Sequence, residues 1–470
     1  MSLDLFLIAD YCQDMKSSCL KAISLFSSAG IGDLAFQKLP VEILLSCELL
    51  QDRHQVYLHN FPKTFPITGD IWQLKDVIVE KTKELLSGDE LDILFATPPC
   101  QGMSKNGRGK LLQGIREGNK PSLDSRNRLI IPTLEIARAL KPRLVVFENV
   151  PEMESTLIED SNGRLVSILE LIGEMLGREY VGRGEIVEFA DYGIPQRRQR
   201  LITVFSRGPQ FKGNLQLLGS LLPSRTHSQT GAGKLKRWVT VRDVISDLPA
   251  LDAKDVSSAR GKHPLHFVPL LDADKYFWVS NTPPEKQAFD NQCVACGFQE
   301  NPGHYAAHDE NGINRTSKET PIRCLRCGEL LPRPWVREGN EVRLMKGYTS
   351  AYKRMAWDFP ASALTTNFAY ACSDNKVHPS QNRVLSIYEA LLLHTVTDYK
   401  FEFKRKDGKP VGAGLIYHII GESIPPRGLE IIFRHLIDLL NCKADEPTEN
   451  MEDELPLLFR SKRESAYQTA

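Results

Sequence analysis

The sequence predicts an α/β fold, with a doubly wound and mostly parallel sheet joined to a smaller, loop-rich segment. Short apolar runs alternate with helix-like stretches through the first half of the 470 residues, which is the rhythm of β–α units in a parallel sheet. Each run ends in polar, glycine or proline residues, and ligands bind at the carboxyl ends of such strands. From about residue 206 to 378 the alternation gives way to Pro, Gly, Ser and basic residues, which predicts the loop-rich segment.

Four apolar runs predict buried strands: "AISLFSSAGIG" (22–32), "VEILLSCEL" (41–49), "LDILFATPP" (91–99) and "LVVFENV" (144–150). The stretch "LIIPTLEIARALK" (129–141) predicts an amphipathic helix, and "TVRDVISDLP" (240–249) a further one. Helical periodicity returns near residue 380 in "NRVLSIYEALLLHTV" (382–396) and "PRGLEIIFRHLIDLLN" (426–441).

Composition limits the class of protein. The 59 Lys and Arg residues balance 59 Asp and Glu, so the net charge gives no long-range attraction to nucleic acid or membrane, and any basic surface must be local. No apolar run reaches the roughly 18 residues of a membrane helix, and the N-terminus lacks the basic start of a signal peptide. We therefore expect a soluble, cytoplasmic protein. Ten cysteines are too few for a disulfide scaffold in a chain of this length.

Polar residues at two strand ends predict a cofactor site. In "SLFSSAGIGD" (24–33), Gly30 and Gly32 would let the backbone approach a bound cofactor closely. Glu48 ends the next predicted strand, where a carboxylate can accept hydrogen bonds from ribose hydroxyls. Asp70 in "ITGDI" is similarly placed for an adenine amino group. For each acid taken alone, a solvated loop residue is the alternative interpretation.

Cys100 is the candidate nucleophile. In "ATPPCQGMS" (96–104), Pro98 and Pro99 restrict the backbone before the thiol, and Gly102 permits a turn after it. The thiol is therefore expected at a strand end, although a small buried side chain is the alternative. Glu148 in "FENVPEM" and the arginines of "QRRQR" (196–200) should project from the same sheet edge, which would bring together a nucleophile, an acid and cations.

Taken together, these motifs resemble those of the DNA cytosine-5 methyltransferases. "SLFSSAGIGDLAF" is similar to the family's S-adenosylmethionine loop, "PPCQGMS" to its nucleophile loop, "ENV" to its acid motif, "QRRQR" to its Gln-x-Arg-x-Arg motif, and "NRVLSIYEALLLH" to its late helix. The ordered set spans about residues 22 to 440. The resemblance implies a Rossmann-like methyltransferase fold. Two departures stand out: Ser28, Ile31 and Ala35 occupy positions that are often Gly, and "GESIPP" has Glu422 where the last motif, Gly-Asn-x-Val, has Asn.

The resemblance implies roles for four catalytic residues. Cys100 would add to carbon 6 of cytosine, and a protonated Glu148, its pKa raised by burial, would hydrogen-bond the ring nitrogen N3. Arg198 and Arg200 would hold the O2 side of the ring and orient Glu148, whereas Arg197 is expected to be a surface charge. No residue could be named as the base that removes the proton of carbon 5. The residues implied to bind S-adenosylmethionine are Phe26, Ser28, Gly30, Gly32, Glu48, Asp70, Ile71, Pro99 and Ser423.

A basic loop is expected to close over the target base. Because the reacting carbon is stacked in a duplex, the family flips the cytosine into its pocket. Residues 104–128 contain several glycines and seven Lys or Arg against two acids, which suits contact with phosphates and movement over the site. A solvated charged loop is the alternative.

Two Cys-x-x-Cys pairs predict a zinc ribbon in the loop-rich segment. Cys293, Cys296, Cys324 and Cys327, with a glycine after each pair, have the spacing of two knuckles that share one tetrahedral ion. Such a closed four-sulfur shell would hold a structural Zn²⁺; redox pairs or unused thiols are the alternatives. His304 and His308 lie between the pairs and could substitute as ligands.

The resemblance also implies an organisation and a function. We expect an N-terminal extension (1–20), a catalytic and cofactor domain (21–205), a target-recognition domain (206–378) with its zinc ribbon (293–327), a return to the catalytic domain (379–442), and an acidic, disordered tail (443–470). The expected partner is double-stranded DNA, and a cognate restriction endonuclease would be linked functionally. An RNA (tRNA) cytosine-5 methyltransferase of the same fold and a catalytically silent DNA-binding relative are the alternatives.

Overall fold

The computed structural model describes residues 19–99, 125–160, 163–304, 306–308, 314–316, 320–339, 341–345 and 350–441 of the chain. Cys100 and residues 101–124 lie outside the described residues, as do the expected N-terminal extension up to residue 18 and the expected tail from residue 442. Among the described helices, none combines the length and the apolar character needed to cross a bilayer.

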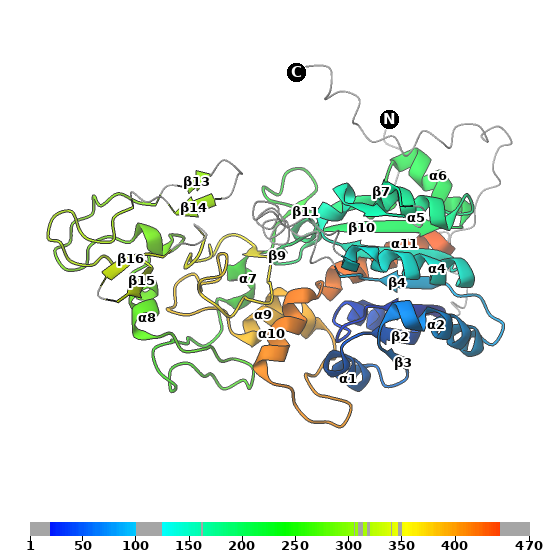
Figure 1. Ribbon diagram of the computed structural model, residues 1–470, viewed down its shortest axis with the longest axis horizontal. Coiled ribbons are helices and arrows are strands. Elements are labelled where there is room, and N and C mark those ends of the chain that lie inside the picture. The colour runs from blue at the N-terminus through cyan, green and yellow to red at the C-terminus, as the bar shows by residue number, and fades with distance from the viewer. Residues whose placement is uncertain are drawn as a thin grey trace, which may run out of the picture.

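A seven-stranded sheet forms the larger part of the fold (Figure 1). All adjacent strands are parallel except β10, which runs antiparallel to both neighbours. The four predicted strands are confirmed, and so is the mostly parallel α/β sheet. In spatial order the strands are β3 (Phe65–Thr68), β2 (Val41–Glu48), β1 (Leu20–Leu25), β4 (Ile93–Ala96), β5 (Leu144–Asn149), β10 (Gln199–Ser206) and β8 (Val181–Glu188).

Helices cover both faces of the sheet, which explains why its strands are continuous apolar runs. Successive residues of β5 alternate between the two cores: Leu144 and Val146 pack on one face, Val145 and Phe147 on the other. The first face is covered by α6 (Pro209–Leu218), α11 (Pro426–Asn441) and the 3₁₀ helix η1 (Gly32–Lys38), and the second by α2 (Ile71–Leu86), α4 (Ile130–Leu140) and α5 (Ile168–Leu176).

Besides the cores on the two faces of the sheet, a third hydrophobic core joins the loop after β1 to residues from the second half of the chain. Ala29 and Ile31 of the loop after β1, together with Val56 of α1 (Gln51–Asn60), pack with α7 (Val241–Ile245), α9 (Ile387–Leu393) and α10 (Ala413–Glu422). Segments distant in sequence therefore support the loop predicted to bind the cofactor.

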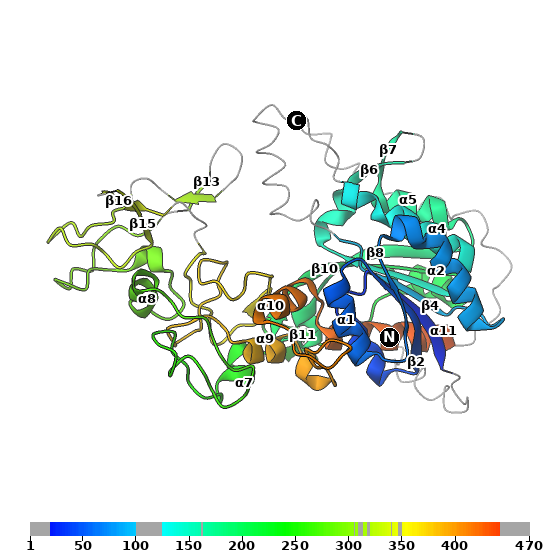
Figure 2. The same ribbon diagram turned by 60° about the horizontal axis from the view of Figure 1, so that its bottom comes forward.

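Short elements dominate the segment farthest from the sheet (Figures 1 and 2). This segment carries α8 (Ala273–Ser280) and two small hairpins, β13–β14 (Ala306–His308, Asn314–Thr316) and β15–β16 (Trp335–Glu338, Glu341–Leu344). Its own core contains Trp278, Phe289, Trp335 and Tyr352. The remaining strands are short: β6 (Leu157–Glu159), β7 (Leu165–Ser167), β9 (Gln196–Arg197), β11 (His227–Ser228), β12 (Lys236–Arg237) and β17 (Ala361–Ser362).

The predicted late helix is shorter than its sequence pattern. Helix α9 begins only at Ile387, because Ser386 and Glu389 form a capping box there. Arg383, which precedes the helix, makes a bidentate ion pair with the same Glu389, and both side chains are fully buried. The apolar residues before Ser386 therefore belong to an extended, buried approach to the helix.

Candidate active site

The loop after β1 has an unusual backbone. Phe26, Ser28 and Gly30 have φ angles of 59°, 47° and 85°, in the left-handed region that side chains disfavour. A Cβ atom at Gly30 would lie 2.6 Å from the ring of Phe61 and 2.8 Å from that of Tyr57, so only glycine fits there. The loop is thereby held in one shape at the carboxyl edge of the sheet.

Glu48 is tied to this loop. Its Oε2 accepts a hydrogen bond from the Ser28 N–H (2.8 Å) and its Oε1 one from the Leu50 N–H (2.9 Å). Burial raises the pKa of Glu48, and these two donors oppose the rise. The carboxylate oxygens retain acceptor capacity beside a loop that is fixed in place.

Several features of this edge fit S-adenosylmethionine. The Ser28 Oγ is buried and has no hydrogen-bond partner among the described residues, as expected where a polar ligand supplies one. Asp70 caps α2 by accepting from the Trp72 N–H (3.0 Å). Leu49, directly after Glu48, is 62% exposed. Leu49 was not predicted from the sequence, where its only signal is an apolar residue next to an acid at a strand end.

The acid motif lies beside an arginine. Glu148 sits near the end of β5, and the Arg200 Nε is 2.7 Å from its Oε1, with the two side chains 9% and 16% exposed. Burial raises the pKa of Glu148, and the charges of Arg200 and then Arg198 offset part of the rise. A buried carboxyl whose pKa is raised can hold a proton and donate it; the catalytic role of Glu148 stays a prediction.

The antiparallel direction of β10 explains how Arg200 reaches Glu148. Ile202 pairs with Glu148 across the two strands, so the first residues of β10 lie where β5 ends. A β10 parallel to its neighbours would have placed Arg200, near the start of the strand, at the opposite edge of the sheet. Only the reversed strand brings "QRRQR" to the acid.

Two further residues anchor the segment that leads to Cys100. The Asn149 Nδ2 donates to the Pro98 carbonyl (3.0 Å), and the Thr97 Oγ1 donates to the Phe26 carbonyl (3.0 Å). The backbone up to Pro99 is thus bound to both the acid motif and the cofactor loop, although Cys100 itself lies outside the described residues. Thr97 and Asn149 were not predicted.

Arg198 contacts a different part of the chain from Arg200. Its Nη1 donates to the Leu364 carbonyl (2.7 Å), and its Nη2 to those of Gly421 (3.2 Å) and Ser423 (2.6 Å). These contacts hold the residue after β9 against Leu364 and the end of α10. The expected contact of Arg198 with cytosine stays a prediction.

The Ser423 hydroxyl is also engaged within the protein. It lies 2.9 Å from the His394 Nε2 and donates to the Ile420 carbonyl (2.9 Å). The expected cofactor contact of Ser423 likewise stays a prediction.

The four cysteines of the two pairs form one cluster. Their Sγ atoms all lie within 4.8 Å of one another, with separations of 3.6 Å for Cys293–Cys327 and Cys293–Cys296 and 3.7 Å for Cys296–Cys324. A tetrahedron with Zn–S bonds of about 2.3 Å has S···S edges of about 3.8 Å, so the donor set fits a zinc ion. His304 is not part of the cluster, and its Nδ1 lies 3.3 Å from the Thr320 Oγ1.

Two polar side chains hold the knuckles together. The Asn301 Oδ1 accepts from the Leu325 N–H (2.9 Å), while its Nδ2 lies 3.3 Å from the Phe298 carbonyl and 3.8 Å from the Cys324 Sγ. The fully buried Arg333 donates to backbone carbonyls next to both pairs, those of Asn291, Pro302 and Pro321. The knuckles are therefore joined by protein contacts as well as by the sulfur cluster.

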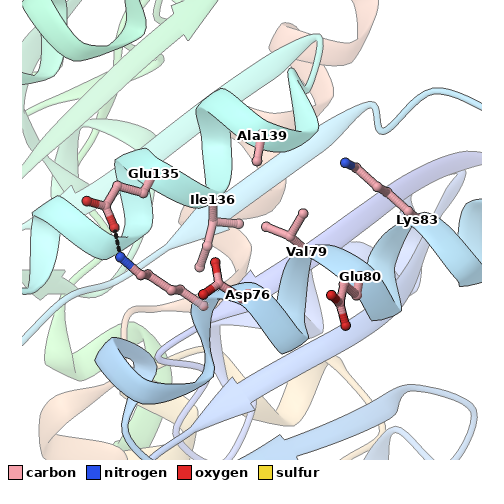
Figure 3. A pocket seen from close by; sticks show the side chains of 8 residues that line it. Asp76, Val79, Glu80, Lys83, Glu135, Ile136 and Ala139 are labelled. Carbon is pink, nitrogen blue, oxygen red and sulfur yellow. Dashed lines mark hydrogen bonds and ion pairs between the residues drawn. The ribbon is translucent and has the colours of Figure 1, made fainter.

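A charged groove between α2 and α4 is separate from these sites. Figure 3 shows Asp76, Glu80 and Lys83 of α2 and Glu135 of α4 along this groove, and Lys75 of α2 pairs with Glu135. None of the residues lining it belongs to the predicted site. Charged side chains of both signs line it, as on a solvated helical surface.

Comparisons with known proteins identify the family of this chain. The family described as C-5 cytosine-specific DNA methylase matches residues 20–438. Among relatives, the Type II methyltransferase M1.HgaI of Avibacterium volantium is 29% identical, covering 90% of this chain and 99% of the relative. M.Bpa9945I of Bacillus paralicheniformis is 26% identical (77% of this chain, 74% of the relative) and M.AgeI of Thalassovita gelatinovora 23% (87% and 96%), both described as Type II methyltransferases. The chain therefore belongs to the C-5 cytosine-specific DNA methylase family and is an enzyme of the DNA (cytosine-5-)-methyltransferase class (EC 2.1.1.37).

Proposed function

We propose that this enzyme methylates carbon 5 of a cytosine in a specific double-stranded DNA sequence through a covalent adduct with Cys100. The observation that carries the proposal is the buried Glu148–Arg200 pair, next to a backbone segment that Asn149 and Thr97 anchor up to Pro99. This arrangement can hold a proton beside a nucleophile loop, which the chemistry of cytosine requires.

Each residue has a step in the proposed mechanism. The Cys100 thiolate adds to carbon 6 of the flipped base, and Glu148 donates a proton to the ring nitrogen N3, which makes carbon 5 nucleophilic. Arg200 keeps Glu148 in place and faces the O2 side of the ring. After methylation a base removes the proton from carbon 5, the Cys100 sulfur leaves as the double bond re-forms, and the proton at N3 returns to Glu148.

S-adenosylmethionine supplies the methyl group when bound. We propose that Glu48 accepts from its ribose hydroxyls and Asp70 from its adenine amino group, while Phe26 and Leu49 offer apolar contact to the purine. The strained loop carrying Ser28, Gly30 and Gly32 approaches it through backbone groups, with Ile71 and Pro99 flanking the site.

We further propose that residues 206–378 form the target-recognition domain and that its cysteine cluster binds one structural Zn²⁺ as a ribbon. The sulfur separations of 3.6–3.7 Å support this assignment. The metal would brace the domain and take no part in catalysis. Metal analysis of the purified protein should give about one zinc per chain.

We also propose that the enzyme is the modification half of a restriction system that protects DNA from a cognate endonuclease. Its similarity to Type II methyltransferases along almost the whole chain supports this role.

One experiment tests the central proposal. The protein and S-adenosylmethionine are incubated with duplex DNA or tRNA containing 5-fluorocytosine, in which fluorine cannot leave as a proton does. We expect a covalent adduct with duplex DNA that disappears in Cys100→Ala. Trapping on tRNA alone would favour the RNA methyltransferase, no adduct at all would favour a silent DNA-binding protein, and an adduct in Cys100→Ala would refute the role of the thiol.

A further inference from the structure

Glu422, the residue that departs from the family motif, has a partner in a distant part of the chain. At the end of α10, its carboxylate makes a two-point contact with Arg53 of α1: Nη1–Oε2 is 2.6 Å and Nη2–Oε1 is 3.1 Å. The side chains are 18% (Arg53) and 29% (Glu422) exposed. Figures 1 and 2 both show α10 next to α1. The unexpected acid is therefore half of an ion pair that joins these helices.

This ion pair lies near Glu48, the proposed ribose acceptor. Arg53 is in the first turn of α1, which begins three residues after Glu48. After burial and the two backbone donors, the next influences on the pKa of Glu48 are the charge of Arg53, which lowers it, and that of Glu422, which raises it. The Arg53 guanidinium thus interacts electrostatically with two carboxylates, those of Glu48 and Glu422, and makes a direct contact with Glu422.

One hydrogen-bond donor of Arg53 is not used within the described residues. Its Nε is buried and has no hydrogen-bond acceptor among the described residues. A half-buried guanidinium that lost its carboxylate partner would pay a desolvation cost and turn to another anion nearby. Glu48 is that anion, and a Glu48 paired with Arg53 would have fewer oxygen lone pairs to offer a ligand.

We propose that Glu422 is a positioning residue for the cofactor: by holding Arg53 in a two-point contact, it keeps this cation off Glu48 and leaves Glu48 available to the ribose hydroxyls. The inference rests on the proposed role of Glu48. It also explains why an acid can occupy the Asn position of the family motif in this chain, since α1 here supplies an arginine that needs a partner.

The test is the dissociation constant of S-adenosylmethionine, measured by calorimetry on the intact protein. Glu422→Gln should weaken binding about tenfold, the usual scale of one charge-assisted hydrogen bond. Arg53→Gln should change it less than about threefold, and the double variant should return to near the wild-type value. A pair that only held the fold together would give the opposite pattern, with both single variants equally impaired and no rescue.

A second ligand and a matched control sharpen the test. S-adenosylhomocysteine carries the same ribose but lacks the sulfonium charge, so Glu422→Gln should weaken both ligands equally. A larger loss for S-adenosylmethionine would overturn the proposal in favour of direct charge pairing. Glu402→Gln removes a carboxylate that lies 2.9 Å from His59 at the other end of α1 and should leave binding unchanged.

The outcomes separate this inference from the proposed function. Unchanged binding in Glu422→Gln, or a loss in Arg53→Gln as large as that in Glu422→Gln, would overturn the inference alone. If Glu48→Gln bound the cofactor as tightly as wild type, the proposed ribose contact would fail, and this inference would fail with it. Melting temperatures of all variants establish that each one is folded.

Discussion

Replacing Arg200 with glutamine tests how Arg200 positions Glu148 and affects its pKa. The Arg200 Nε lies 2.7 Å from the Glu148 Oε1, and neither side chain is more than 16% exposed. A contact to a charged group of this kind contributes about 1.5–3 kcal/mol. If the contact is kept in the transition state, its loss should slow methyl transfer roughly 10- to 160-fold, at about 1.36 kcal/mol per factor of ten.

The pH dependence gives a second, more specific readout. Burial raises the pKa of Glu148, and Arg200 is the first of two cations that oppose the rise. Removing Arg200 should therefore raise this pKa further. If Glu148 donates a proton as proposed, activity should fall as pH rises through its pKa, and this fall should move to higher pH in Arg200→Gln. Folding stability follows the same sign: a carboxyl with a raised folded pKa stabilises the protein at low pH, and that contribution is lost as pH rises towards the folded value.

The assay is transfer of a labelled methyl group to duplex DNA across a pH series, at saturating cofactor. Arg197→Gln is the matched control, because Arg197 is a neighbouring arginine that is 47% exposed and lies 3.5 Å from Glu188; it should lose less than about threefold. The reasoning is refuted if the fall in activity of Arg200→Gln stays at the wild-type pH or moves to lower pH, or if Arg197→Gln is equally slow.

Three other predictions follow from the same structure. Cys324→Ser, or removal of metal by a chelator, should abolish zinc binding and lower the melting temperature, as measured by metal analysis and calorimetry; a metal-free wild-type protein with an unchanged melting temperature would contradict this. Glu389→Gln should lower the free energy of unfolding in urea by about 3–5 kcal/mol, because it leaves the fully buried Arg383 unpaired, whereas Asp407→Asn in an exposed pair should have no measurable effect. Gly30→Ala should cost about 1–3 kcal/mol of stability from its positive φ alone and weaken cofactor binding. Gly32→Ala, whose Cβ would lie 3.4 Å from the Leu429 side chain and 3.9 Å from that of Phe95, should be milder; equal effects would argue against the close contact at Gly30.

Features that depend on local sequence pattern could be predicted from the sequence alone. Strands buried on both faces must be continuously apolar, so β1, β2, β4 and β5 could be found without partners. The cysteine pairs could also be found, because knuckle spacing is a local property: Gly297 and Gly328 after them adopt φ angles of 72° and 77°, which glycine permits.

Contacts between distant segments were not predictable from local pattern. Periodicity does not say that β10 runs antiparallel beside β5, and only that direction brings Arg200 to Glu148. Nor does it reveal that Arg53 pairs with Glu422, 369 residues away. Such partners depend on tertiary packing, so a residue type could be predicted at a site while its contact could not.

A hydrogen-bonded chain behind the acid site shows why the Gln-x-Arg-x-Arg motif needs its glutamine. The Leu364 N–H donates to the Gln196 Oε1 (3.1 Å), so the Gln196 Nε2 must be the atom that donates to the His394 Nδ1 (3.0 Å). The His394 Nε2 then carries the hydrogen and donates to the Ser423 Oγ (2.9 Å). This requires a neutral imidazole, and burial together with the charges of Arg198 and Arg200 holds the pKa of His394 well below its usual range.

The direction of that chain has a structural consequence. Gln196 and Arg198 both bind Leu364, and both reach the end of α10, Gln196 through His394 and Arg198 directly. Arg200, two residues further on, pairs with Glu148. One short stretch therefore contacts Leu364 and the end of α10 through Gln196 and Arg198, and Glu148 through Arg200. The alternate residues of the motif thus each have a partner of their own: Gln196 and Arg198 hold the stretch against Leu364 and the end of α10, which leaves Arg200 beside Glu148.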